Sequence, residues 1–75
     1  MSVKYFAALR EIRGCVDERV EVTEGTTLSD LYDQLFPPDS ERPTVAFARN
    51  ARMARGTETI APGDEVAFLP PLGGG

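Results

Sequence analysis

Hydrophobic side chains recur at helical spacing in one stretch of the chain, residues 28–36. They stand at positions i, i+3, i+4, i+7 and i+8 and form one continuous stripe: Leu28, Leu31, Tyr32, Leu35 and Phe36. Thr27 and Asp30 have the spacing of a capping box at the start of this helix, and Pro37 ends it. The pattern therefore predicts one amphipathic helix whose apolar stripe must be covered by a sheet.

Alternating or β-rich segments predict strands at residues 2–8, 18–23, 44–49 and 65–69, with a short, weak strand at 52–54. In the first strand Val3 and Tyr5 share one face, and the pattern does not decide which face buries Phe6. Residues 9–14 can form a helical turn that ends at a left-handed Gly14. Residues 61–64, with proline and glycine at the central positions, predict a type II turn before the last strand.

The order of these elements is strand, strand, helix, strand, weak strand, strand. It predicts an α+β fold of the β-grasp, ubiquitin-like kind, with a mixed sheet of four to five strands packed on one main helix. A ferredoxin-like fold would need a second full helix, and residues 54–61 are too short and too polar to supply it. We expect residues 1–69 to form this domain and residues 70–75 to form an extended, flexible C-terminal glycine tail.

Composition narrows the possible chemistry. The chain has 75 residues, no histidine and a single cysteine, Cys15. This excludes a disulfide within the chain, a tetrahedral zinc site and histidine-based acid–base or nucleophilic catalysis. We therefore expect no catalytic side chain and no metal site, and a stand-alone enzyme is disfavoured. For Cys15 itself, a small buried or half-buried residue is favoured over a sulfur relay.

Charge and hydropathy narrow the possible partners. Twelve acidic and eight basic residues give a formal net charge of −4, which argues against nucleic-acid binding. No apolar run approaches the roughly 20 residues that span a bilayer, and the N-terminus lacks a signal-peptide pattern. We therefore expect a cytoplasmic protein with no membrane partner. Arg49, Arg52 and Arg55 cluster in sequence, where a solvated loop is the favoured interpretation and a patch for an acidic partner is the alternative.

The last residues hold the candidate chemistry. Pro70 and Pro71 stiffen the exit from the final strand, and three glycines without a Cβ can pass through a narrow channel: Gly73, Gly74 and Gly75. Five or six extended residues reach about 16–21 Å, enough to place a terminal carboxylate in a partner's active site. An ATP-using partner could convert it into an acyl-adenylate, from which sulfur would give a thiocarboxylate and an amine would give an amide. A frayed, inert end is the alternative.

An apolar face next to the tail is the candidate partner-docking site. Its expected members are Phe68, Leu69, Pro70, Pro71 and Leu72. Because side chains alternate along a strand, we expect either Phe68 or Leu69 to fill the core instead. Apolar side chains surrounded by polar ones are typical of interface hot spots.

Three segments, residues 6–11, 26–31 and 62–75, carry a resemblance to a known family, and the last is the specific one. It reads Pro-Gly-Asp-Glu-Val-Ala-Phe-Leu-Pro-Pro-Leu-Gly-Gly-Gly. The chain resembles the sulfur-carrier family of MoaD and ThiS, and within it the small subunits of molybdopterin synthase most. Gly73 departs from the family pattern, as does the arginine-rich stretch between Ala48 and Arg55.

The resemblance implies a role for the C-terminus. A ubiquitin-activating-type, MoeB-like enzyme would use ATP to adenylate Gly75, which becomes a thiocarboxylate, while the carrier binds no cofactor itself. The carrier would then donate sulfur to a precursor on a large, MoaE-like synthase subunit, giving the dithiolene of molybdopterin within a heterotetramer. Alternatives are sulfur supply to thiamine, cysteine or tRNA thiolation, a ubiquitin-like modifier that forms isopeptide bonds, and an interaction module with an inert tail.

Overall fold

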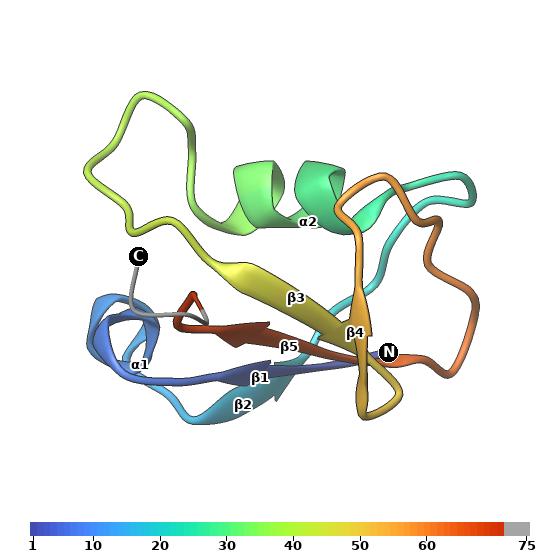
Figure 1. Ribbon diagram of the computed structural model, residues 1–75, viewed down its shortest axis with the longest axis horizontal. Coiled ribbons are helices and arrows are strands. Elements are labelled where there is room, and N and C mark those ends of the chain that lie inside the picture. The colour runs from blue at the N-terminus through green and yellow to red at the C-terminus, as the bar shows by residue number, and fades with distance from the viewer. Residues whose placement is uncertain (72–75) are drawn as a thin grey trace.

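A five-stranded mixed sheet and two helices make up residues 1–71, the part of the chain that the computed structural model describes (Figure 1). The strands are β1 (Ser2–Tyr5), β2 (Asp17–Arg19), β3 (Ala46–Arg49), β4 (Arg52–Ala54) and β5 (Glu65–Leu69). The helices are α1 (Ala8–Arg13) and α2 (Leu28–Leu35). The order of strands in the sheet is β2–β1–β5–β3–β4, so the last strand of the chain lies at the centre.

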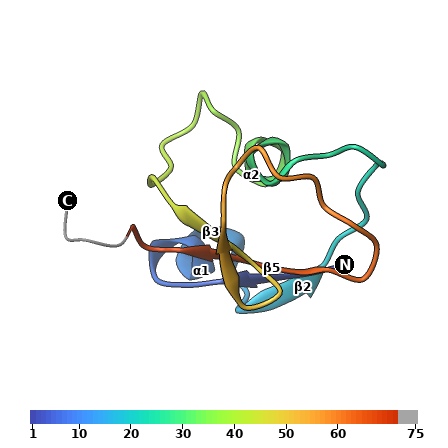
Figure 2. The same cartoon turned by 45° about the vertical axis from the view of Figure 1, so that its right-hand side comes forward.

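The pairing of the strands is that of a β-grasp fold. β1 and β5 are parallel, whereas β1–β2, β3–β5 and β3–β4 are antiparallel. α2 crosses one face of the sheet, and α1 lies at the end of the sheet where β1 and β5 finish (Figures 1 and 2). The predicted fold class is therefore confirmed.

The predicted helix and its cap are confirmed. The Thr27 Oγ1 atom accepts a hydrogen bond from the Asp30 amide (3.1 Å), and the Asp30 carboxylate accepts one from the Thr27 amide (3.2 Å). This capping box satisfies two amides that the first turn of a helix leaves without partners. Leu28, Leu31 and Tyr32 are buried against the sheet, as is Phe36 just after the helix.

Three strands are shorter than the alternation predicts. The extent of pairing limits two of them, and a turn of the chain limits the third. β2 covers 17–19 rather than 18–23, since its register with β1 ends at the pair Ser2–Arg19. β1 covers 2–5 rather than 2–8, because the chain turns at Phe6 into α1. β3 covers 46–49 rather than 44–49, since its partner β5 ends at Leu69, before a proline that cannot donate to the sheet.

Aromatic rings fill the core between the sheet and α2. Phe68 lies at its centre, with ring centroids 5.2 Å from Tyr32, 5.7 Å from Phe47 and 6.1 Å from Tyr5. Val3 and Tyr5 are fully buried, whereas 36% of Phe6 is exposed, which settles the face left open by the sequence.

Among residues 1–71, no helix combines the length and the apolar character needed to cross a bilayer.

The turns lie at the predicted glycines and, between β3 and β4, at Asn50 and Ala51. Gly14 ends α1 with φ 76, and Gly63 has φ 82 in a turn closed by the Asp64 amide on the Ala61 carbonyl (3.2 Å). Asn50 and Ala51, between the paired residues Arg49 and Arg52, both have positive φ, at 52 and 67. Two such residues form a type I′ hairpin turn, which asparagine adopts readily and alanine does not.

Candidate functional site

The root of the C-terminal segment leaves the sheet from its central strand. β5 is paired on both sides, with Leu69 opposite Ala46 of β3 and Phe68 opposite Tyr5 of β1. Pro70 and Pro71 follow at the surface, and because proline has no amide hydrogen the ladder cannot continue. Pro70 and Pro71 are therefore joined to a strand that is paired on both sides.

The residues expected to dock a partner differ in how exposed they are. Phe68 is completely buried in the aromatic core, so of the pair Phe68 and Leu69 it is Phe68 that fills the core, and it offers no surface to a partner. Leu69 is half-buried and Pro70 and Pro71 are exposed, so docking through these three stays a prediction. Leu72, Gly73, Gly74 and Gly75 lie outside the described residues, and so does most of the tail predicted at 70–75.

A small apolar cleft of about 100 Å³ opens beside the strand exit, and we call it the tail-root cleft. Its walls come from three segments far apart in sequence, residues 6–9, 43–45 and 68–71. Only the last of these segments was predicted from the sequence to take part in docking. The sequence signal for the first wall was the large apolar side chain of Phe6. The alternation of the first strand did not show whether that side chain lies in the core or at the surface.

The first wall is a tight turn from Phe6 to Leu9. The Leu9 amide donates to the Phe6 carbonyl (3.2 Å), and Ala7 has φ 50 and ψ −127, a conformation that favours glycine. Leu9 is buried and fixes the turn to the core, while the Arg10 guanidinium lies 6.0 Å from the centre of the Phe6 ring. Strained backbone of this kind persists only where its surroundings hold it in place.

The second wall, residues 43–45, is held by α2. The Tyr32 hydroxyl donates to the Pro43 carbonyl, and burial raises the pKa of Tyr32, so the hydroxyl stays protonated and keeps this bond at neutral pH. Arg42 donates to the Phe36 carbonyl (2.6 Å), pairs with Asp33 (2.8 Å) and stacks over the Tyr32 ring at 4.5 Å. The loop after α2 is therefore fixed where it borders the cleft.

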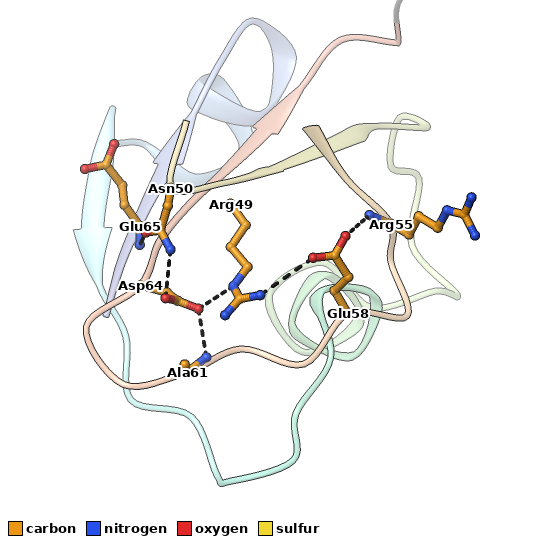
Figure 3. Close-up of polar contacts among 7 residues, drawn as sticks. All are labelled: Arg49, Asn50, Arg55, Glu58, Ala61, Asp64 and Glu65. Carbon is orange, nitrogen blue, oxygen red and sulfur yellow. Dashed lines mark hydrogen bonds and ion pairs between the residues drawn. The ribbon is translucent and has the colours of Figure 1, made fainter. Parts of the chain in front are cut away.

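A polar network lies at the opposite end of β5, around Asp64 (Figure 3). Its carboxylate accepts hydrogen bonds from Arg49 Nε (2.6 Å), the Ala61 amide (2.8 Å) and Asn50 Nδ2 (2.9 Å). The bond from Ala61 is the main cause that lowers the pKa of Asp64 to about 2, followed by those from Asn50 and Arg49. Asp64 is thus a turn residue, as predicted, which ties the β3–β4 hairpin to the start of β5.

The three clustered arginines do not form one patch. Arg49 is bound to Asp64 and lies 3.6 Å from Glu58, so it belongs to the network inside the fold. Arg52 and Arg55 are exposed on and just after the edge strand β4.

Cys15 is half-buried against the core, as expected. Within the described ranges, no three potential metal-binding side chains of the histidine, cysteine or carboxylate type come together.

The tail-root cleft is built for contact rather than for chemistry. Among residues 1–71, its lining is mostly apolar, with Thr44 as a polar member, and neither a carboxylate nor a thiol is part of it. Such a surface can bury an apolar side chain of a partner next to the point where the chain leaves the sheet.

The family model described as the ThiS family matches residues 3–75, which includes the terminal glycines. The chain belongs to this family. Two relatives named as molybdopterin synthase sulfur carrier subunits resemble it over its full length. The one from Chlamydomonas reinhardtii is 37% identical, and 98% of that protein is covered. The one from Mycobacterium tuberculosis is 38% identical, with 96% covered.

A solved structure supports the fold assignment. The crystal structure of small archaeal modifier protein 1 from Haloferax volcanii superimposes with a TM-score of 0.76 at 32% sequence identity. The match covers 95% of each chain. The chain is therefore a member of the ThiS family with a β-grasp fold.

Proposed function

We propose that this protein is a sulfur carrier whose reactive group is the carboxylate of Gly75. The observation that carries the proposal is the family match, which extends through the terminal glycines at 73–75 to relatives named as sulfur carrier subunits. The geometry at the base of the tail is compatible with that role, because the central strand holds it and an apolar cleft lies beside it.

The chemistry requires an external activating enzyme. A carboxylate is a poor electrophile, so attack of a Gly75 oxygen on the α-phosphate of ATP forms an acyl-adenylate and releases pyrophosphate. Hydrosulfide supplied by a donor then attacks the acyl carbon and displaces AMP, and loss of its proton leaves a thiocarboxylate. The folded body provides the surface by which the adenylating partner recognises the carrier.

The finer assignment that we propose is the small subunit of molybdopterin synthase. On this assignment the thiocarboxylate of Gly75 donates its sulfur to a precursor bound by a large synthase subunit, and the dithiolene of molybdopterin results. Its support is the name of the two relatives, molybdopterin synthase sulfur carrier subunit, each matched over the full length of this chain. The tail-root cleft is the docking surface that we propose for both the adenylating enzyme and the large subunit.

A ubiquitin-like modifier is the second candidate. It is favoured by the structural similarity to small archaeal modifier protein 1. In this alternative a lysine amine of a target protein, rather than sulfur, attacks the Gly75 acyl-adenylate, and an isopeptide bond forms as AMP leaves. Both candidates share the activation step and differ only in the nucleophile.

Incubation with the cognate adenylating enzyme, ATP and a sulfur donor separates these possibilities. Replacement of one oxygen by sulfur in the intact mass supports the carrier, whereas covalent adducts on lysines of other proteins support the modifier. Capture of a large synthase subunit by the native chain supports the finer assignment. An unchanged mass, in a reaction that converts an authentic carrier, contradicts both candidates.

A further inference from the structure

The backbone at Ala7 is strained at a position where glycine would relieve the strain. Ala7 has φ 50 and ψ −127, the geometry of the first central residue of a type II′ turn, which glycine normally occupies. Among residues 1–71, three other positions of positive φ are glycines, and a fourth is Asn50, a residue type that tolerates such angles. Within this range, Ala51 is the other strained alanine.

Ala7 is also an unfavourable residue for the start of a helix. It is the N-cap of α1, and its side chain forms no capping hydrogen bond. Serine, threonine, aspartate, asparagine and glycine are preferred at an N-cap, and alanine is far less favourable. Two independent local preferences therefore oppose alanine at position 7. Breaks with local preference of this kind are expected where function, rather than stability, determines the residue.

The neighbouring residues hold the turn in its strained form. Tyr5 before the turn is fully buried, and its amide donates to the Val16 carbonyl (2.8 Å). Leu9 after the turn is buried, and the Arg10 amide donates to the Ala7 carbonyl (3.1 Å). Because both sides are fixed, exposed Ala7 is held in one place at the surface.

The strained turn is part of the wall of the tail-root cleft. Figures 1 and 2 show α1, which follows the turn, beside the end of β5. Pro71 borders the same cleft, and Gly75 is the fourth residue after it. Four extended residues span at most about 14 Å, so an enzyme that binds the terminal carboxylate has its own surface close to the cleft.

We propose that Ala7 is a positioning residue for the adenylating enzyme, because its strained turn lowers folding stability but holds a rigid apolar wall against which that enzyme packs. This inference rests on the function proposed above. A contact surface that is fixed before binding loses less conformational entropy when the partner associates. Glycine at position 7 removes the methyl group and allows the turn more conformations, so it relieves strain in the fold and weakens association.

Two alanine-to-glycine variants test the proposal. Ala51 is strained like Ala7 but lies in the β3–β4 hairpin, outside the segments 6–9, 43–45 and 68–71 that form the cleft, so Ala51→Gly is the matched control. Urea unfolding reports the stability of each variant. The rate of ATP–pyrophosphate exchange by the cognate adenylating enzyme, measured at varied carrier concentration, gives KM for the carrier and kcat.

We expect both variants to raise the urea midpoint, because each relieves a positive φ. Ala7→Gly should raise KM about fivefold and change kcat less than about twofold, since it weakens binding and leaves the Gly75 carboxylate unaltered. Ala51→Gly should change neither constant.

The outcomes separate this inference from the proposed function. An unchanged KM for Ala7→Gly, or the same rise in KM for both variants, overturns the role of Ala7 in binding. A lower urea midpoint for Ala7→Gly shows that the turn is not strained, and a fall in kcat without a rise in KM places the effect on activation, so each overturns the proposal. If the wild-type chain supports no exchange with an enzyme that adenylates an authentic carrier, the proposed function itself fails.

Discussion

Truncation of Phe68 to alanine separates a core role from a docking role for this residue. Phe68 has no exposed surface, and its ring lies between 5.2 and 6.3 Å from four other aromatic rings. Removal of a buried phenylalanine typically costs about 3–5 kcal/mol, and lost aromatic pairs place this site in the upper half of that range. A 75-residue domain has about 4–11 kcal/mol of stability in total, so the variant should lie close to unfolding.

Urea unfolding followed by circular dichroism measures the effect. Phe68→Leu, a milder change that we expect to stay folded, gives a second point in the same series. Phe6→Ala is the matched control, because Phe6 is 36% exposed and should cost about 1 kcal/mol or less. On the proposed function, Phe6→Ala weakens binding to the adenylating partner while the fold persists. A Phe68→Ala variant as stable as Phe6→Ala would refute the core assignment.

Three further changes test local features of the fold. Ala51→Gly should raise the free energy of unfolding by about 1 kcal/mol, because glycine removes the strain of a positive φ, and an unchanged urea midpoint would contradict this. Thr27→Ala should lower it by about 1 kcal/mol through loss of the capping box, with Ser29→Ala as the control. The lowered pKa of Asp64 contributes about 2 kcal/mol to the free energy of unfolding at neutral pH. That contribution is complete above the unfolded pKa near 4 and is lost as pH falls through about 2; Asp64→Asn should lack this acid dependence in titrated unfolding, and a parallel profile would count against it.

Much of the fold could be predicted from local patterns. The helical stripe, the capping pair Thr27–Asp30 and the turn at Gly63 each depend on a few neighbouring residues, and the structure confirms all three. Strand ends could not be predicted as well, since they depend on partners distant in sequence. β3 begins at Ala46 rather than at residue 44 because its partner β5 ends before Pro70, and no local pattern around residue 44 reveals this.

The site was predictable where its residues are consecutive and not where the fold assembles it. The tail itself is one continuous motif, so its candidate role followed from the sequence. The tail-root cleft combines three segments that are distant in sequence. Arg49 forms ion pairs with Asp64 and Glu58, which only the fold brings close to it, so it does not act together with Arg52 and Arg55. Such pairings are set by tertiary contacts and have no local sequence signal.

The most direct measurement is the mass of the C-terminal fragment after reaction with the cognate adenylating enzyme, ATP and a sulfur donor. The proposed function predicts that fragmentation places one oxygen-to-sulfur replacement on Gly75, and that a variant without Gly74 and Gly75 gains no sulfur. Sulfur found elsewhere in the chain, or a shortened variant that still delivers sulfur at the full rate, would contradict it.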